Sequence, residues 1–310
     1  MPLRASVVAA PPPPPPPGQS VEHLFVTWTA PDGTVIPLTN RSLGWWLIPG
    51  AVYLGAAPVT VVTDPNPRGG VTVRHVQPEM RIVALTAHVQ GATHVEFMSR
   101  WRQLSRAFTQ TRRLGPGVLT VTQPDGVSRQ ISAYYQSGMD GQPGLGWLQD
   151  QPVITLLCED PYWTDVEDTT VVRTYSAGDA ESFLAPFPHI TDSRVLGSTT
   201  ISVDGDAEVW PVWTITGPAS GITATRSDTG DSFTLTPIGG AMIAGDTVTI
   251  TTDPPSVIGP AGTSWIAALD WPDAVLWGLP PGDTPVVFTV SGGDVTTSIT
   301  LAYRNRWETV

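Results

Sequence analysis

The side chains that most often carry out chemistry are sparse in this chain and do not fall into the spacings that chemistry requires. Its five histidines, at positions 23, 75, 88, 94 and 189, show no metal-ligand spacing and no neighbouring nucleophile motif. The chain has no lysine, which excludes a phosphate loop of the Gly-Lys-Ser/Thr type, and it has no Gly-Xaa-Ser-Xaa-Gly motif. We therefore expect no catalytic residue, no metal ligand and no cofactor, and we predict that the protein is not an enzyme.

Paired acids offer the nearest approach to an ion site. Asp204 with Asp206, and Asp228 with Asp231, supply carboxylate oxygens of the kind that calcium prefers, but neither pair belongs to a full oxygen-ligand loop. Acids at such spacing are more typical of turns. The single cysteine, Cys158, excludes an intrachain disulfide, and we predict that it is a buried small apolar residue.

The twelve tryptophans indicate a different chemistry, because exposed indole faces can stack on sugar rings. Core packing explains a tryptophan in a β-sandwich more often than ligand stacking does. Stacking nevertheless keeps a carbohydrate-binding adhesion module, recognising host cell-wall glycans, as an alternative function. The tryptophans at positions 210, 213, 265, 271 and 277 lie in the expected second sandwich, and the candidates for glycan stacking are Trp210, Trp265 and Trp271.

One stretch of the chain, residues 93–114, has a clear helical period. Its apolar residues recur at spacings of four, three and four, which puts them on one face of an α-helix. Thr93 and Glu96 stand in capping-box relation, and Gly115 follows as a stop. We therefore predict a helix over residues 93–114 that packs on a sheet through Phe97, Trp101, Leu104 and Phe108.

The remaining surface of this helix is rich in arginine, so we predict an exposed positive face. Such a face usually meets acidic groups, and we interpret it as an interface with another protein chain. A solvated helix face is the alternative. The residues assigned to this interface are Arg100, Arg102 and Arg106, and Arg112 and Arg113 follow on the same segment.

Charge divides the chain into two parts of opposite sign. Residues 1–113 hold ten arginines and five acids, whereas residues 114–310 hold six arginines and twenty-three acids, so the net charges are +5 and −17 and sum to −12. Opposite charges favour association with copies of the same chain or with differently charged neighbours. They make nucleic acid a poor partner, and the longest apolar runs are too short for membrane insertion.

The order of the elements predicts two domains. An arm over residues 1–20 includes seven consecutive prolines and should be extended. Strands followed by one helix and further strands indicate an α+β domain over residues 21–168, a β-sandwich with the helix 93–114 packed on it. A connection over 169–195 leads to an antiparallel β-sandwich over 196–310. The strands of the first domain are expected near 59–63, 71–76, 83–89, 118–122, 129–136 and 153–158, and those of the second near 199–203, 212–216, 222–226, 233–237, 247–251, 285–290 and 298–303.

Several motifs resemble a known family. Residues 81–83 (Arg-Ile-Val), 97–104 (Phe-Met-Ser-Arg-Trp-Arg-Gln-Leu), 117–121 (Gly-Val-Leu-Thr-Val) and 156–163 (Leu-Leu-Cys-Glu-Asp-Pro-Tyr-Trp) resemble the N-terminal domain of the distal tail proteins (Dit-like minor tail proteins) of long-tailed siphovirus bacteriophages. The most specific of them is Asp160-Pro161-Tyr162-Trp163, which often ends this domain in phages of actinobacteria. The C-terminal motifs, residues 209–218, 228–230, 244–250 and 303–307, are similar to that family as well.

The resemblance implies a structural virion protein at the distal end of the phage tail, synthesised in the host cytoplasm. Its first domain would be the belt domain of a sixfold ring, and its second a galectin-like sandwich that projects outward. The expected partners are further copies of the chain, forming a hexamer, the tail tube protein, and a tail-tip fibre or tail-associated lysin protein. The arginine face would then meet a ring neighbour or the tube, and a host glycan remains a further candidate ligand.

Overall fold

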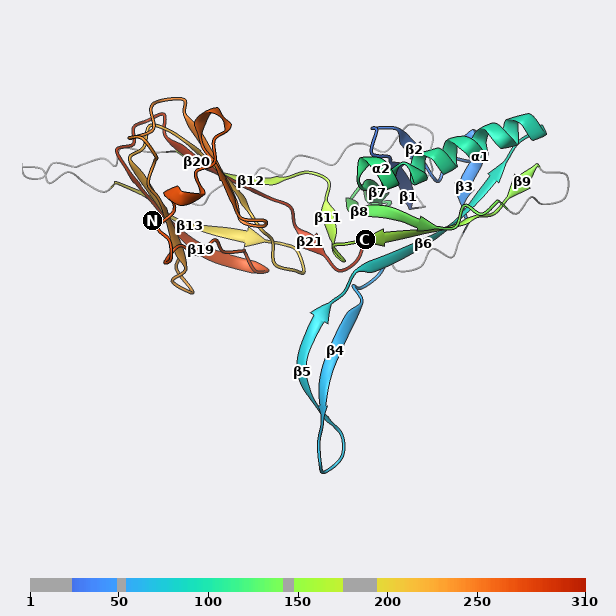
Figure 1. Cartoon of the computed structure of the whole chain (residues 1–310), viewed down its shortest axis with the longest axis horizontal. Helices are drawn as coiled ribbons and strands as arrows, with labels where there is room; N and C mark the ends of the chain where they lie inside the picture. Colours follow the sequence, from blue (N-terminus) through green and yellow to red (C-terminus); the bar gives the residue numbers. More distant parts are fainter. Residues whose placement is uncertain (1–23, 49–53, 142–147, 175–193) are drawn as a thin grey trace, which may run out of the picture. The chain divides into compact units, whose positions relative to one another are not determined.

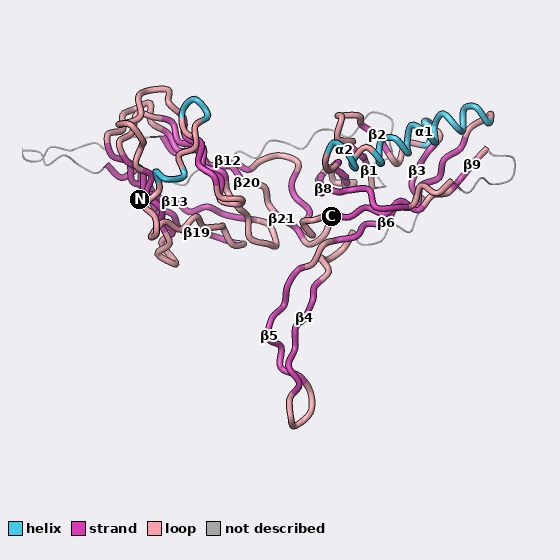
Figure 2. The backbone as a smooth tube through the Cα atoms, in the orientation of Figure 1, coloured by secondary structure: helices cyan, strands magenta, loops and turns pink. Residues whose placement is uncertain are grey.

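The computed structural model describes residues 24–48, 54–141, 148–174 and 194–310. The chain divides into two compact units. The N-terminal unit comprises the described residues up to Val166 together with Arg306–Val310, and the C-terminal unit comprises those of 167–305. The arm over residues 1–20 lies outside the described residues. Strands dominate both units, as the backbone trace in Figure 2 makes plain.

The N-terminal unit is built on an antiparallel sheet in the order β2-β1-β7-β8-β10-β6-β3 (Figure 1). Short strands extend it, because β9 pairs with β6, and β11 pairs with both β8 and β21. A separate two-stranded hairpin, β4-β5, follows β3 and precedes β6 in the sequence. The strands are β1 (Phe25–Thr29), β2 (Val35–Pro37), β3 (Trp45–Leu47), β4 (Val59–Pro65), β5 (Val71–Pro78), β6 (Arg81–Gln90), β7 (Gly117–Thr122), β8 (Ser128–Ser137), β9 (Gln149–Asp150), β10 (Val153–Cys158), β11 (Trp163–Asp165) and β21 (Arg306–Trp307), and one 3-10 turn is η1 (Arg41–Leu43).

Helix α1 (His94–Thr109) packs on this sheet through the face that the sequence predicts. Phe97, Leu104 and Phe108 are buried, and Trp101 packs against the same core. The ring of Phe108 stacks on Trp28 of β1 with 4.7 Å between centroids. The Thr93 half of the predicted capping box is confirmed, because its side chain accepts a hydrogen bond from the Glu96 amide. The Glu96 carboxylate accepts the amide of Ala92 at 2.7 Å, one residue before the amide that a capping box uses.

The single helix predicted over 93–114 is in fact two. α1 ends at Thr109, and the short helix α2 (Thr111–Leu114) follows Gln110. The buried side chain of Thr111 donates to the Phe108 carbonyl at 3.0 Å and accepts from the Tyr135 amide of β8 at 3.1 Å. These bonds tie the chain to the sheet at the break, which a helical period in the sequence does not reveal.

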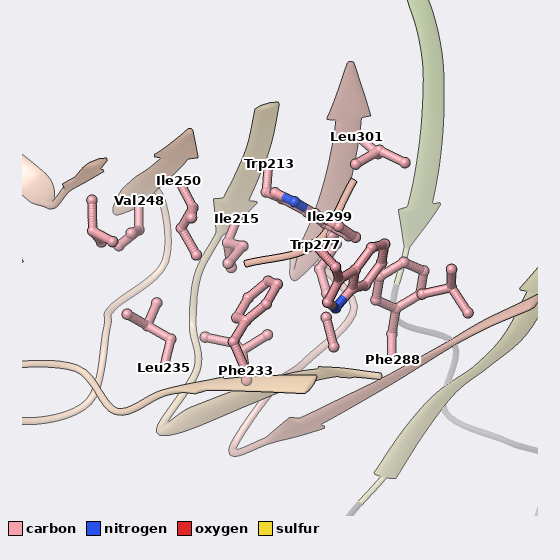
Figure 3. Packing of buried hydrophobic residues seen from close by; sticks show 14 of the residues in the cluster. Trp213, Ile215, Phe233, Leu235, Val248, Ile250, Trp277, Phe288, Ile299 and Leu301 are labelled. Carbon is pink, nitrogen blue, oxygen red and sulfur yellow. The ribbon is translucent and has the colours of Figure 1, made fainter. Parts of the chain in front are cut away.

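The C-terminal unit is an antiparallel β-sandwich, as expected. One sheet has the order β12-β20-β14-β17-β18 and the other β13-β19-β15-β16. Trp213 lies in the core between the two sheets (Figure 3). The rings of Phe233, Trp277 and Phe288 meet its ring edge-on, with 5.0–5.7 Å between ring centroids. The strands are β12 (Thr169–Thr174), β13 (Arg194–Val203), β14 (Val212–Thr216), β15 (Gly221–Arg226), β16 (Ser232–Leu235), β17 (Thr247–Thr251), β18 (Ser256–Ile258), β19 (Gly282–Ser291) and β20 (Ser298–Tyr303), with 3-10 turns η3 (Pro260–Gly262) and η4 (Ile266–Ala268).

The prediction of a mainly β chain with one packed helix is confirmed, whereas the limits of the second domain differ from those expected. The connection placed at 169–195 contains β12, which pairs along its whole length with β20 of the sandwich. The second domain is predicted to extend over 196–310, but Arg306–Val310 belong to the N-terminal unit. The sequence does not predict β12 because the composition of residues 169–195 is mixed. It does not predict β21 because a strand of two residues is too short to show an alternating pattern.

Candidate assembly surfaces

The β4-β5 hairpin is the most unusual surface of the N-terminal unit, because it projects from the sheet as two strands on which no other described segment packs (Figure 1). Its strands join through a tight turn in which the amide of Asn66 bonds the Gly70 carbonyl at 3.0 Å. Gly69 and Gly70 both take positive φ, of 93° and 80°, as this turn requires. The sequence patterns at 59–63 and 71–76 predict these strands, and both are confirmed.

The register of the hairpin makes it amphipathic. Directly opposed residues share a face, and β4 pairs Val59 with Pro78, Val61 with Val76, Thr63 with Val73, and Pro65 with Val71. Successive residues alternate between faces, so these pairs all lie on one side of the hairpin. The register shift between Val62 and Thr63 leaves Arg74 as an extra residue and keeps Val71 and Val73 on the same side as Val76.

This apolar face of the hairpin, defined as Val59, Val61, Val71, Val73 and Val76 with Pro65 and Pro78, is open to solvent. The exposed fractions of its valines lie between 48% and 62%. The opposite face carries polar groups, including the ion pair of Arg74 with Asp64 at 2.7 Å. An isolated two-stranded hairpin is only marginally stable in water, and an uncovered apolar patch usually marks an interaction site. The hairpin therefore has the composition of a docking element.

The arginine face of α1 divides into two parts. Arg100 is turned back onto its own unit, where it pairs with Glu96 at 2.7 Å and donates to the Gln90 carbonyl at 2.7 Å. Its guanidinium packs against Gly44, whose missing side chain leaves room for it. Arg100 is therefore only partly exposed, unlike the exposed residue that the sequence predicts, and the helical period could not reveal this because Gln90 and Gly44 lie outside the helix.

Arg102 and Arg106 are exposed and line a groove between α1 and the β1-β2 turn. Asp32 lies on the far wall, and hydrogen bonds from Thr34 hold the pKa of its carboxyl below the usual range, with Arg106 adding a smaller contribution. Because one carboxylate faces two guanidinium groups, the groove keeps a net positive charge. Its other lining residues are Thr34, Gln103, Ala107 and Gln110.

The candidate tryptophans of the C-terminal unit have different surroundings. Trp271 is 51% exposed and donates its indole N–H to the Ile266 carbonyl at 2.8 Å, while Trp210 is 39% exposed. Trp265 is half-buried and packs against the sandwich core. Trp213 and Trp277 are buried, as core packing, the more common role of a tryptophan in a β-sandwich, leads one to expect.

The residues considered for metal or redox chemistry have structural roles. Cys158 is fully buried, as predicted, and burial raises the pKa of its thiol to about 12. Asp228 pairs with Arg226 at 2.8 Å inside a turn. Within the described ranges, no group of three or more potential ligands could hold a metal ion, and no helix is long and apolar enough to span a bilayer.

Comparison with solved structures finds a similar fold in a phage hub protein and in a phage baseplate chain. No protein-family model and no curated sequence matches the chain. Among solved structures, the SPP1 Dit (gp 19.1) protein, described as a paradigm of the hub adsorption apparatus in phages infecting Gram-positive hosts, is similar over 92% of this chain and 99% of its own, with a TM-score of 0.65 and 13% identity. A chain of the phage P2 baseplate in its activated conformation is similar over 93% of this chain and 100% of its own, with a TM-score of 0.55 and 11% identity.

Proposed function

We propose that the protein is a structural subunit of a phage tail tip, and that its copies close into a distal hub ring between the tail tube and the tail-tip proteins. The observation that carries the proposal is the apolar face of the hairpin, which no part of the chain that the structure describes covers. Likeness over nearly the full length to a hub protein and to a baseplate chain supports the same conclusion. Neither of these proteins is described as an enzyme, in agreement with the lack of any catalytic motif in this sequence.

We infer that the partner that covers the apolar face of the hairpin is a second copy of this chain. In a cyclic ring each subunit contributes two different surfaces, one that reaches out and one that receives, so a projecting hairpin on every copy can be covered by the next copy. The positive groove of Arg102 and Arg106 supplies a second contact, because residues 114–310 carry a net charge of −17. The sixfold number, the actinobacterial host, the tube protein and the fibre or lysin partner rest on the sequence resemblance.

Photo-crosslinking tests this assignment. A photoreactive phenylalanine analogue placed at Val73, on the apolar face of the hairpin, should give covalent dimers and a ladder of larger species, with the crosslinked peptide lying in the N-terminal unit of another copy. The same analogue at Val295, 75% exposed in a turn of the C-terminal unit, is the matched control and should give no ladder. Crosslinks from Val73 confined to single chains would overturn the proposal.

Glycan binding by the C-terminal unit is the second candidate, and the exposed indole faces of Trp210 and Trp271 support it. A glycan array probed with the full chain, and with Trp271→Ala as the comparison, tests it. Binding that the substitution abolishes would assign host recognition to this unit. Equal signals for the two proteins, or no signal for either, would remove this candidate and leave the hub proposal unchanged.

A further inference from the structure

A buried arginine organises the base of the hairpin. Arg81, the first residue of β6, is fully buried, and its guanidinium donates to three backbone carbonyls from three distant segments. Nε donates to Pro161 at 2.6 Å, Nη2 donates to Glu308 at 2.9 Å, and Nη1 donates to Gly55. A buried guanidinium is costly unless its N–H groups are hydrogen-bonded. Arg81 therefore joins the three segments that supply these carbonyls and fixes their positions.

Two residues of this hydrogen-bond cluster border the hairpin directly. Gly55 lies just before β4, and Arg81 lies just after β5, where the Glu79 amide also donates to the Pro58 carbonyl at 2.8 Å. The direction in which β4 and β5 leave the sheet is therefore set by contacts at their base, since none of the described residues outside the hairpin covers it along its length.

The segment that supplies the Glu308 carbonyl is distant in the sequence from the rest of the N-terminal unit. Residues Arg306–Val310 follow β20 in the sequence, yet they return to the N-terminal unit, where β21 pairs Trp307 with Trp163 of β11. The Glu308 carboxylate accepts the amide of Ala57 at 2.8 Å, and the Val310 amide donates to the Leu54 carbonyl at 3.3 Å. Together with the bond from Arg81, these contacts fix residues 54–57 from outside.

Stacked cations anchor this returning segment. The guanidinium of Arg129 lies over the Trp307 ring, 4.0 Å from its centroid, and that of Arg306 lies over the Tyr162 ring at 4.4 Å. Trp307 also donates its indole N–H to Asp165 at 2.7 Å. The segment is thus bound to the unit by its side chains as well as its backbone.

We propose that Arg306–Val310 is a clasp that fixes the base of the β4-β5 hairpin, with Arg81 as the positioning residue that joins the two. Because the clasp follows the C-terminal unit in the sequence, the hairpin is held in place only after that unit has been synthesised. Chains that stop before residue 306 would lack a positioned hairpin and would be excluded from the ring. This last consequence rests on the proposed function, whereas the clasp itself does not.

Hydrogen exchange of the full chain, measured on its monomeric fraction, tests the clasp. Glu308→Ala should raise exchange of peptides covering 54–60 and 76–82 by about tenfold, because the Ala57 amide loses its acceptor. Arg81→Lys, which cannot supply the planar fork, should raise exchange in the same peptides. Thr309→Ala is the matched control, since only the backbone carbonyl of Thr309 is used, and peptides of β14, β17 and β20 should be unchanged in every variant. Parent-like exchange at 54–60 in both Glu308→Ala and Arg81→Lys would overturn the clasp.

A second readout separates the clasp from the ring. Crosslinking from Val73 should fall in Glu308→Ala and stay at the parent level in Thr309→Ala. If Glu308→Ala raises exchange at the hairpin base but leaves crosslinking at the parent level, the clasp does not control assembly. Raised exchange in the variants, with no crosslinking in any protein including the parent, would support the clasp and contradict the proposed ring.

Discussion

Arg306 and Asp160, which lie 146 residues apart in the sequence, form an ion pair with 2.7 Å between guanidinium and carboxylate. The pair joins the Asp160-Pro161-Tyr162-Trp163 motif to the closing motif of residues 303–307. These two motifs carry much of the sequence resemblance to distal tail proteins, and the structure brings Arg306 and Trp307 of the closing motif against the first motif in the N-terminal unit. Their residue types are therefore explained by packing rather than by chemistry.

Removing this pair should destabilise the N-terminal unit. Arg306→Ala loses both the partner of Asp160 and the cation over the Tyr162 ring, so we expect the free energy of unfolding to fall by about 1–2 kcal/mol. Arg74→Ala is the matched control, because its pair with Asp64 is largely exposed and should contribute little. Denaturant unfolding followed by tryptophan fluorescence measures both, and equal losses in the two variants would contradict this reading.

Charging the apolar face of the hairpin should block assembly without unfolding the subunit. We expect Val61→Lys combined with Val73→Lys to leave the free energy of unfolding within about 0.5 kcal/mol of the parent, because both side chains are half exposed. The same variant should remain monomeric, since buried lysines without partners are costly in an interface. Sedimentation velocity measures the association, and Val295→Lys serves as the exposed-valine control. Normal association of the doubly charged hairpin would show that its apolar face is not the contact.

The two parts of the arginine face should respond differently to substitution. Arg102→Glu with Arg106→Glu should weaken association and reduce its dependence on salt, while the melting temperature stays close to that of the parent. Arg100→Ala should lower the free energy of unfolding by about 1 kcal/mol, because it removes a bonded, partly buried group. Association and thermal melting, measured together, separate the two effects. A lower melting temperature for the variant with Arg102→Glu and Arg106→Glu would contradict the role of these residues in association alone. A loss of association without a loss of stability in Arg100→Ala would contradict the structural role of Arg100.

The buried thiol of Cys158 should make stability fall in alkaline solution. Its pKa is about 12 in the folded chain and 9.0 in the unfolded chain, so above pH 9.0 the unfolded state loses a proton that the folded state keeps. The free energy of unfolding should be insensitive to this group below pH 9.0 and fall as pH rises from there, by up to about 1.4 kcal/mol per pH unit. Cys158→Ala should show a shallower decline between pH 9.0 and 10.0, below the range in which Tyr303 adds the same trend. Identical slopes in that interval would contradict the burial of the thiol.

Most of the strands could be predicted from the sequence because alternating apolar residues and Gly, Pro and Asp turns mark them locally. The core face of α1 was predictable for the same reason. Arg81 and Glu308 were not, because their roles depend on contacts between segments far apart in the sequence. The apolar face of the hairpin also escaped prediction, since alternating valines ordinarily indicate a strand whose apolar side is covered by its own domain.

The mass of the purified full-length protein in solution, measured by light scattering over a series of concentrations, tests the ring most directly. We expect a species of six times 33.0 kDa whose negative-stain images are annular, and we expect the hairpin variant with Val61→Lys and Val73→Lys to measure 33.0 kDa under the same conditions. A mass of 33.0 kDa for the parent at every concentration, with no annular particles, would contradict self-assembly through the hairpin.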